Sequence, residues 1–98
     1  MSRPSKSPRI VAKESVGSLS FPPDEVLITD EQLDQRKKNL EIAVTLGNLE
    51  HQKVRIFFQD SEAFKMVETT IWALTPERIL LKGGVSIPVH RIFEVQVI

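Results

Sequence analysis

From residue 54 to the C-terminus, the chain consists of short runs in which apolar residues recur at every second position. Turn-forming residues separate these runs. The runs lie near residues 54–59, 65–74, 79–82, 85–87 and 93–97. A period of two places successive side chains on opposite faces of a β-strand. Because the connections are short, neighbouring strands are expected to be antiparallel. The pattern therefore predicts a small, mainly β domain.

Two of the connections carry specific turn signals. The run Thr75-Pro76-Glu77-Arg78 has proline at the second position, which favours a β-turn. Gly83 and Gly84 supply the positive φ angles that a tight hairpin needs. These turns return the chain directly to the neighbouring strand, and a strongly bent sheet of this size closes into a small barrel.

A short helix is expected before the strands. Thr29 is a good N-cap, and Gln32 stands three residues later, as a capping box requires. Acidic residues follow Thr29, and the basic run Arg36-Lys37-Lys38 suits the negative end of the helix dipole. The signals predict a helix of two or three turns, with the basic run as its end rather than a binding site.

The segment from Leu40 to Leu46 allows two interpretations. Apolar residues alternate with polar or small ones, which predicts a further strand. A helix that continues through Gly47 is the competing interpretation, because Leu40 and Val44 lie on one helical face. The strand is the interpretation favoured by the pattern.

The N-terminal residues have a different composition. Among residues 1–23, four basic residues against one acidic residue give a charge of +3, whereas nine basic and twelve acidic residues give −3 over residues 24–98. The net charge of zero therefore hides a basic tail on an acidic body. Few large apolar residues are present to offset the cost of ordering, so residues 1–28 are expected to form a disordered, Ser/Pro-rich tail. Residues 29–98 would form the folded domain.

Several kinds of chemistry are absent from the sequence. The chain has no cysteine, which excludes disulfides, thiolate metal sites and cysteine nucleophiles. Its two histidines, His51 and His90, lie in different turns and at no metal-ligand spacing. Lys82-Gly83-Gly84 is interpreted as a hairpin rather than a phosphate loop. We therefore expect no catalytic residue, no metal site and no cofactor.

One tryptophan and one phenylalanine are the candidate contact residues. If Val67 and Ile71 face the core, Trp72 points outward; in the opposite orientation, which we favour, Trp72 is buried. Phe57 is expected to point outward beside Arg55. Together with Arg91, these residues would then form a mixed aromatic and basic patch, consisting of Arg55, Phe57, Trp72 and Arg91. Such a patch suits single-stranded nucleic acid or a protein partner.

The end of the sequence resembles the end of an SH3-like barrel. That family carries Ile-Pro, an aliphatic residue four positions after the proline and another three further on, here Ile87-Pro88, Ile92 and Val95. The resemblance implies a 3₁₀ turn over residues 89–91 and an antiparallel, five-stranded barrel. A helix before the strands is also similar to Sm-like barrels and to the Rof-like Rho inhibitors, which have that fold.

These observations predict a non-catalytic binding or adaptor module. The expected partner is a protein, with self-association through strand edges as one form of it. The alternative is an RNA-binding or RNA-regulatory protein of the Sm-like or Rof-like kind. The sequence contains no apolar run of signal-peptide length and no segment of roughly 20 apolar residues. A cytoplasmic protein without a membrane partner is therefore expected.

Overall fold

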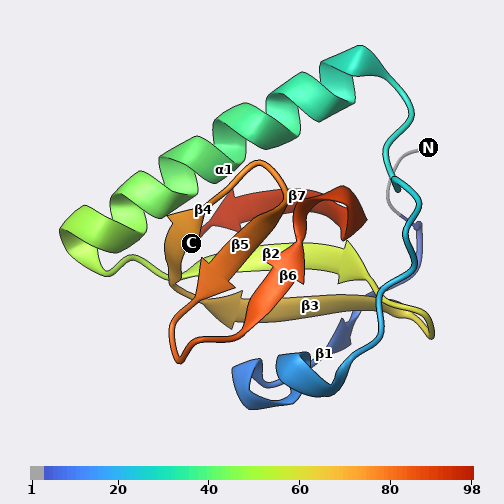
Figure 1. Ribbon diagram of the computed structural model, residues 1–98, viewed down its shortest axis with the longest axis horizontal. Helices are drawn as coiled ribbons and strands as arrows, with labels where there is room; N and C mark the ends of the chain where they lie inside the picture. The colour runs from blue at the N-terminus through green and yellow to red at the C-terminus, as the bar shows by residue number, and fades with distance from the viewer. Residues whose placement is uncertain (1–3) are drawn as a thin grey trace.

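The computed structural model describes residues 4–98, which form seven strands and one α-helix (Figure 1). The strands lie in two sheets. A four-stranded sheet has the order β1-β3-β2-β7, and a three-stranded sheet has the order β4-β5-β6. In chain order the elements are β1 (Arg9–Ile10), η1 (Lys13–Ser18), α1 (Asp30–Glu50), β2 (Val54–Gln59), β3 (Phe64–Thr69), β4 (Ile71–Leu74), β5 (Arg78–Leu81), β6 (Ser86–Pro88), η2 (Val89–Arg91) and β7 (Ile92–Val97).

The mainly β domain that the alternating pattern predicts is confirmed, but no closed barrel is found among the described residues. The pairs β2–β3, β2–β7, β4–β5 and β5–β6 are antiparallel, as expected, whereas β1 pairs with β3 in parallel. Gly83 and Gly84 have φ angles of 97° and 92°, so the predicted hairpin is present. The single strand expected over 65–74 is two strands, which separate at Thr70 and belong to different sheets.

Helix α1 is much longer than predicted, and the strand expected over 40–46 is wrong. The helix spans 21 residues, or about 30 Å at 1.5 Å per residue. Its buried positions include Leu40, Ala43 and Gly47, which follow a helical spacing. A Cβ atom at Gly47 would collide with the carbonyl oxygen of Ile71, so glycine allows the helix to approach β4 closely. The competing interpretation, a helix through Gly47, is therefore the correct one.

The predicted start of this helix is confirmed. The Thr29 hydroxyl accepts a hydrogen bond from the Gln32 N–H (3.1 Å), and the Gln32 side chain accepts one from the Thr29 N–H (3.2 Å). The helix ends at His51, which adopts the left-handed conformation with φ of 55°. The basic run at residues 36–38 lies in the middle of the helix and does not end it, contrary to expectation.

The main core lies between the two sheets and under α1. Strand β2 contributes Val54, Ile56 and Phe58, every second residue, as the sequence pattern predicts. The other fully buried side chains come from the helix, the remaining strands and η1; the largest are Leu40, Ile71, Ile79, Leu81, Ile87 and Ile92. The 3₁₀ turn implied by the family resemblance is η2.

The expectation of a disordered tail that reaches residue 28 does not hold over residues 9–28. Strand β1 pairs with β3, and Val16 of η1 is 1% exposed within the main core. Val26 and Leu27 are also buried. These few apolar residues are enough to order the segment because each packs against residues far away in the sequence. Residues 1–3 of the expected tail lie outside the described residues.

Candidate functional site: two outer faces

The outer face of the four-stranded sheet is covered by the chain itself. Phe57 alternates with the core residues of β2, so its ring points away from the main core. It packs in a second apolar cluster that contains Val26, Leu27, Phe57, Phe64, Met66 and Phe93. The ring centroids of Phe64 and Phe93 are 5.6 Å apart in an edge-to-face arrangement. Residues 22–28, which we call the strap, supply Val26 and Leu27 and exclude this face from solvent.

A buried arginine of α1 holds one end of the strap. The Arg36 guanidinium donates to both carboxylate oxygens of Glu25, at 2.7 Å and 2.6 Å, and to the carbonyl oxygen of Ile92 at 2.9 Å. Burial acts to raise the pKa of Glu25, but the hydrogen bonds and the charge of Arg36 outweigh it, so the pKa lies below its ordinary value. The pair links the strap to α1 and β7.

Two residues of η2, His90 and Arg91, hold other parts of the strap. Arg91 donates to the Asp24 carbonyl oxygen (2.8 Å) and carboxylate (3.1 Å), and its Nε donates to the Gln59 carbonyl oxygen (3.0 Å). His90 Nε2 lies 3.0 Å from the carbonyl oxygen of Pro22. The contacts with Pro22 and Asp24 join the strap to residues almost 70 positions later. Arg91 and His90 therefore have structural roles.

A second buried ion pair closes the turn between β2 and β3. Lys65 Nζ donates to Asp60 at 2.5 Å, and both residues are buried. Burial acts to raise the pKa of Asp60, but hydrogen bonds from Lys65 and from the N–H groups of Ala63 and Glu62 outweigh it and leave the pKa below its ordinary value. The Asp60 carboxylate is therefore ionised and fully used within the fold.

The four residues predicted to form one patch lie in different places. Arg55 is exposed and forms an ion pair with Glu68 (3.3 Å). Phe57 is 6% exposed beneath the strap, and Arg91 is 5% exposed against Asp24. Trp72 is 44% exposed, so the favoured interpretation of a buried tryptophan is wrong. The patch does not form because the strap covers Phe57 and because Trp72 belongs to the other sheet.

The outer face of the three-stranded sheet carries Trp72 in an open position. Ile79 and Leu81 of β5 are fully buried, so Leu80 between them points outward and is 38% exposed. Leu80 pairs with Ala73, and the Lys82 N–H bonds to the Thr70 carbonyl oxygen. Trp72 therefore lies on the neighbouring strand between the levels of Leu80 and Lys82.

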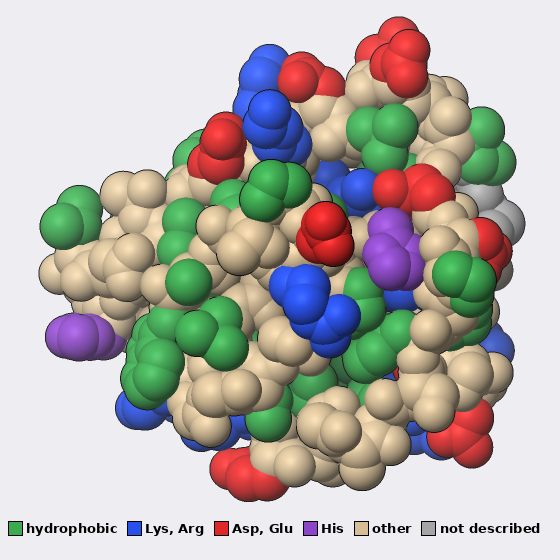
Figure 2. Space-filling view, viewed as in Figure 1, with side chains coloured by type: hydrophobic (Ala, Val, Ile, Leu, Met, Phe, Trp, Pro, Cys, Tyr) green, Lys and Arg blue, Asp and Glu red, His purple; other side chains and the backbone are tan. Residues whose placement is uncertain are grey.

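Two exposed cations lie near Leu80. Arg78 stands two residues before it at the start of β5, and a strand places such positions on one face. Lys82 stands two residues after it, in the turn that follows the strand. The Arg78 Nε donates to Ser86 Oγ of β6 at 2.9 Å, which holds the guanidinium over the sheet. We call Trp72, Arg78, Leu80 and Lys82 the open face. Figure 2 looks onto this side of the molecule, with hydrophobic side chains gathered where α1 ends and β4 begins.

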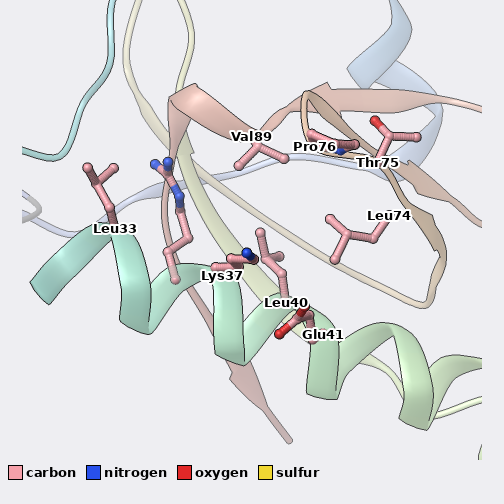
Figure 3. A pocket seen from close by; sticks show the side chains of 9 residues that line it. Leu33, Lys37, Leu40, Glu41, Leu74, Thr75, Pro76 and Val89 are labelled. Carbon is pink, nitrogen blue, oxygen red and sulfur yellow. The ribbon is translucent and has the colours of Figure 1, made fainter. Parts of the chain in front are cut away.

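A groove of about 440 Å³ borders the open face, between α1 and the turn from β4 to β5. Apolar side chains point into it from both sides (Figure 3); they are Leu33, Leu40, Leu74, Pro76 and Val89. Lys37 and Glu41 add one charge of each sign from α1. Leu74 belongs to the same strand as Trp72, so the groove and the open face are adjacent parts of one surface.

Among residues 4–98, no group of three or more His, Asp or Glu side chains lies close enough to hold a metal ion. No helix within this part of the chain has the length and apolar character needed to cross a membrane. No family model, curated protein or solved structure matches the chain. The open face and its groove are thus the candidate functional site.

Proposed function

We propose that the chain is a non-catalytic binding or adaptor module that holds a partner protein against the open face. The observation that carries this proposal is the exposure of Trp72 and Leu80 beside an apolar groove. Tryptophan is enriched among the residues that dominate binding energy in protein interfaces. A groove next to it provides a pocket in which an apolar side chain of the partner loses contact with water.

The rest of the molecule supports this choice of surface. The comparable aromatic face on the four-stranded sheet is sealed by the strap, whereas the open face has no such cover among the described residues. Ile42 and Leu49 of α1 are also exposed apolar residues. A contiguous apolar surface on a small domain is typical of an interaction site.

We also propose that the two sheets are parts of a small barrel of the SH3-like or Sm-like type, in a cytoplasmic protein. Strands β3 and β4 are separated by one residue, and each pairs within a different sheet, as a sharply bent strand would. After η2 the chain returns through β7 to pair with β2. This connectivity supports the family resemblance of the Ile87-Pro88 segment, and it leaves the function to be argued from the surface.

The experiment uses Trp72 as its own reporter, since it is the only tryptophan. Proteins captured by cross-linking from an extract of the producing cells are compared between the wild-type chain and the Leu80→Ser variant. A protein recovered by the wild-type chain alone is then purified and titrated. We expect its binding to shift Trp72 emission to shorter wavelength. Equal recovery by both chains, or binding without any change in emission, would contradict the proposal.

RNA binding is the second candidate, because the open face combines an aromatic ring with Arg78 and Lys82. Fluorescence anisotropy with mixed-sequence single-stranded RNA, at low and moderate salt, tests it. Phosphate contacts predict binding that weakens steeply as salt increases. Loss of that binding in the Trp72→Ala variant would favour this function over a protein partner.

A further inference from the structure

We infer that the segment which docks on the open face is an acidic stretch of a partner protein, with one large apolar residue between two carboxylates. This inference rests on the proposed function and names the chemistry of its partner. It follows from the order of side chains at residues 78, 80 and 82: Arg78 and the outward Leu80 belong to β5, and the second cation, Lys82, directly follows the strand.

The spacing on β5 defines the spacing in the ligand. Side chains on one face of a strand recur every two residues, so Arg78 and Leu80 are about 6.6 Å apart along β5 at 3.3 Å per residue. Lys82 lies just beyond the strand, where its N–H still bonds to the Thr70 carbonyl oxygen, so the backbone continues the pairing by one residue. An extended peptide that lies along β5 has the same repeat. A carboxylate, an apolar side chain and a second carboxylate at alternate positions would therefore oppose Arg78, Leu80 and Lys82 in turn. Trp72, on the neighbouring strand, would cover the apolar side chain.

The charges around this row favour an acidic ligand. Glu77 precedes Arg78 in the turn and is exposed. Two cations against this one acid leave the row positive, while residues 24–98 as a whole carry −3. The Ser86 contact orients Arg78 in advance, which lowers the cost of fixing its side chain on binding.

Two other occupants fit the same surface less well. In a symmetric contact between two copies of this face, Arg78 and Lys82 would approach the same cations of the second copy, which is unfavourable. Single-stranded nucleic acid is usually bound by several aromatic side chains that stack successive bases. Trp72 is the only aromatic residue of the open face. An acidic protein segment uses both the cations and the leucine.

The test titrates the full chain with the blocked peptide Gly-Glu-Ser-Leu-Ser-Glu-Gly and follows Trp72 emission. The control peptides replace both Glu by Lys, or Leu by Ser. We expect the acidic leucine peptide to shift the emission at a concentration roughly tenfold below either control, since two exposed charge pairs and one apolar contact are at stake. No shift with this peptide, or the same half-saturation for all three, would overturn the inference.

Charge reversal sharpens the test. The double variant Arg78→Glu/Lys82→Glu should lose the acidic peptide and gain the lysine peptide, again by roughly tenfold. The matched control, Lys38→Glu/Lys53→Glu, changes the net charge equally at exposed positions away from the open face, and it should bind as the wild-type chain does. Equal losses in both double variants would show a general charge effect and overturn the inference.

Two experimental outcomes distinguish an error in the ligand's chemistry from an error in the proposed function. A captured partner that needs Leu80 but contacts the open face through a basic or uncharged segment would overturn the inference alone. A Trp72 shift with single-stranded RNA, and none with the peptides, would overturn both.

Discussion

The two sheets of this domain present similar apolar outer faces to very different surroundings. On the four-stranded sheet, Phe57 is 6% exposed beneath Val26 and Leu27 of the strap. On the three-stranded sheet, Trp72 is 44% exposed and only a groove lies beside it. Both faces offer large apolar side chains, so the sheets alone do not explain the difference.

The difference lies in charged residues that anchor the cover. The strap places only Val26 and Leu27 in the second cluster, whereas Glu25 and Asp24 connect it to the buried cations Arg36 and Arg91. Paired charges of this kind are directional and penalise alternative placements. In this fold, the apolar face that is covered is the one whose cover is also held by ion pairs. The open face carries cations too, but among the described residues no strap carboxylate reaches them.

The largest effect should come from the buried pair in the turn between β2 and β3. In Asp60→Ala, Lys65 loses its partner while still buried, so the free energy of unfolding should fall by about 3–5 kcal/mol. Urea unfolding followed by circular dichroism measures this change. Replacement of both residues, as Asp60→Ala/Lys65→Met, should recover much of the loss. If the single variant is as stable as the wild type, the buried pair does not contribute to stability as expected.

A smaller loss is expected when the cover itself is weakened. Leu27→Ser removes an apolar contact with the second cluster, and the free energy of unfolding should fall by about 2 kcal/mol. The variant should also bind more of a fluorescent apolar dye, because the aromatic side chains of the sheet become accessible. Ile28→Ser is the matched control, since Ile28 is 71% exposed, and its dye binding should be unchanged.

Acid should destabilise the covered face more than the open one. The pKa values of Glu25 and Asp60 lie below their ordinary values in the folded chain, so the unfolded chain takes up protons more readily. Their contribution is present above the ordinary carboxylate range and is lost as the pH falls through it and below. The urea midpoint should therefore decrease between pH 6 and pH 3. In Glu25→Gln the decrease should be smaller, and an unchanged decrease would assign it to other carboxylates.

The smallest change in stability is expected on the open face. Leu80→Ser should alter the free energy of unfolding by no more than about 0.5–1 kcal/mol, because the side chain is already partly in water. Its effect should appear instead in peptide binding. A loss as large as that of Leu27→Ser would mean that the open face is structural.

Local signals in the sequence identified the elements whose causes are local. The capping box at Thr29 and Gln32, the glycines of the hairpin and the alternation along β2 all depend on residues a few positions apart. The sequence pattern predicts a strand rather than a helix beyond Leu40 for two reasons. The buried side of the helix includes Ala43 and Gly47, which add little to an apolar pattern, and the apolar Ile42 is exposed. The close approach of Gly47 to Ile71 is a long-range contact, which periodicity does not detect.

The candidate site was predicted only in part, for the same reason. The sequence names Trp72 as a candidate contact residue but favours its burial, whereas Trp72 is 44% exposed. Its proposed companions Phe57 and Arg91 are covered by residues 30 or more positions earlier. Leu80 and Lys82 belong to the strand predicted over 79–82, whereas Arg78 is predicted in the turn before it; in the structure β5 begins at Arg78 and ends at Leu81. Their alignment with Trp72 required the register of β4 and β5, which includes an irregularity between Ile71 and Ala73.

The contacts of the strap also constrain how the chain matures during synthesis. Asp24 is bonded to Arg91, 67 residues later, and β1 pairs with a strand that begins at residue 64. Translation produces the N-terminal part first. Residues 9–28 therefore leave the ribosome before most of the groups that hold them exist, the exception being Arg36, which follows Glu25 by 11 residues. The strap can take its full set of contacts only after η2 has emerged, and until then the aromatic side chains of β2 and β3 have an incomplete cover.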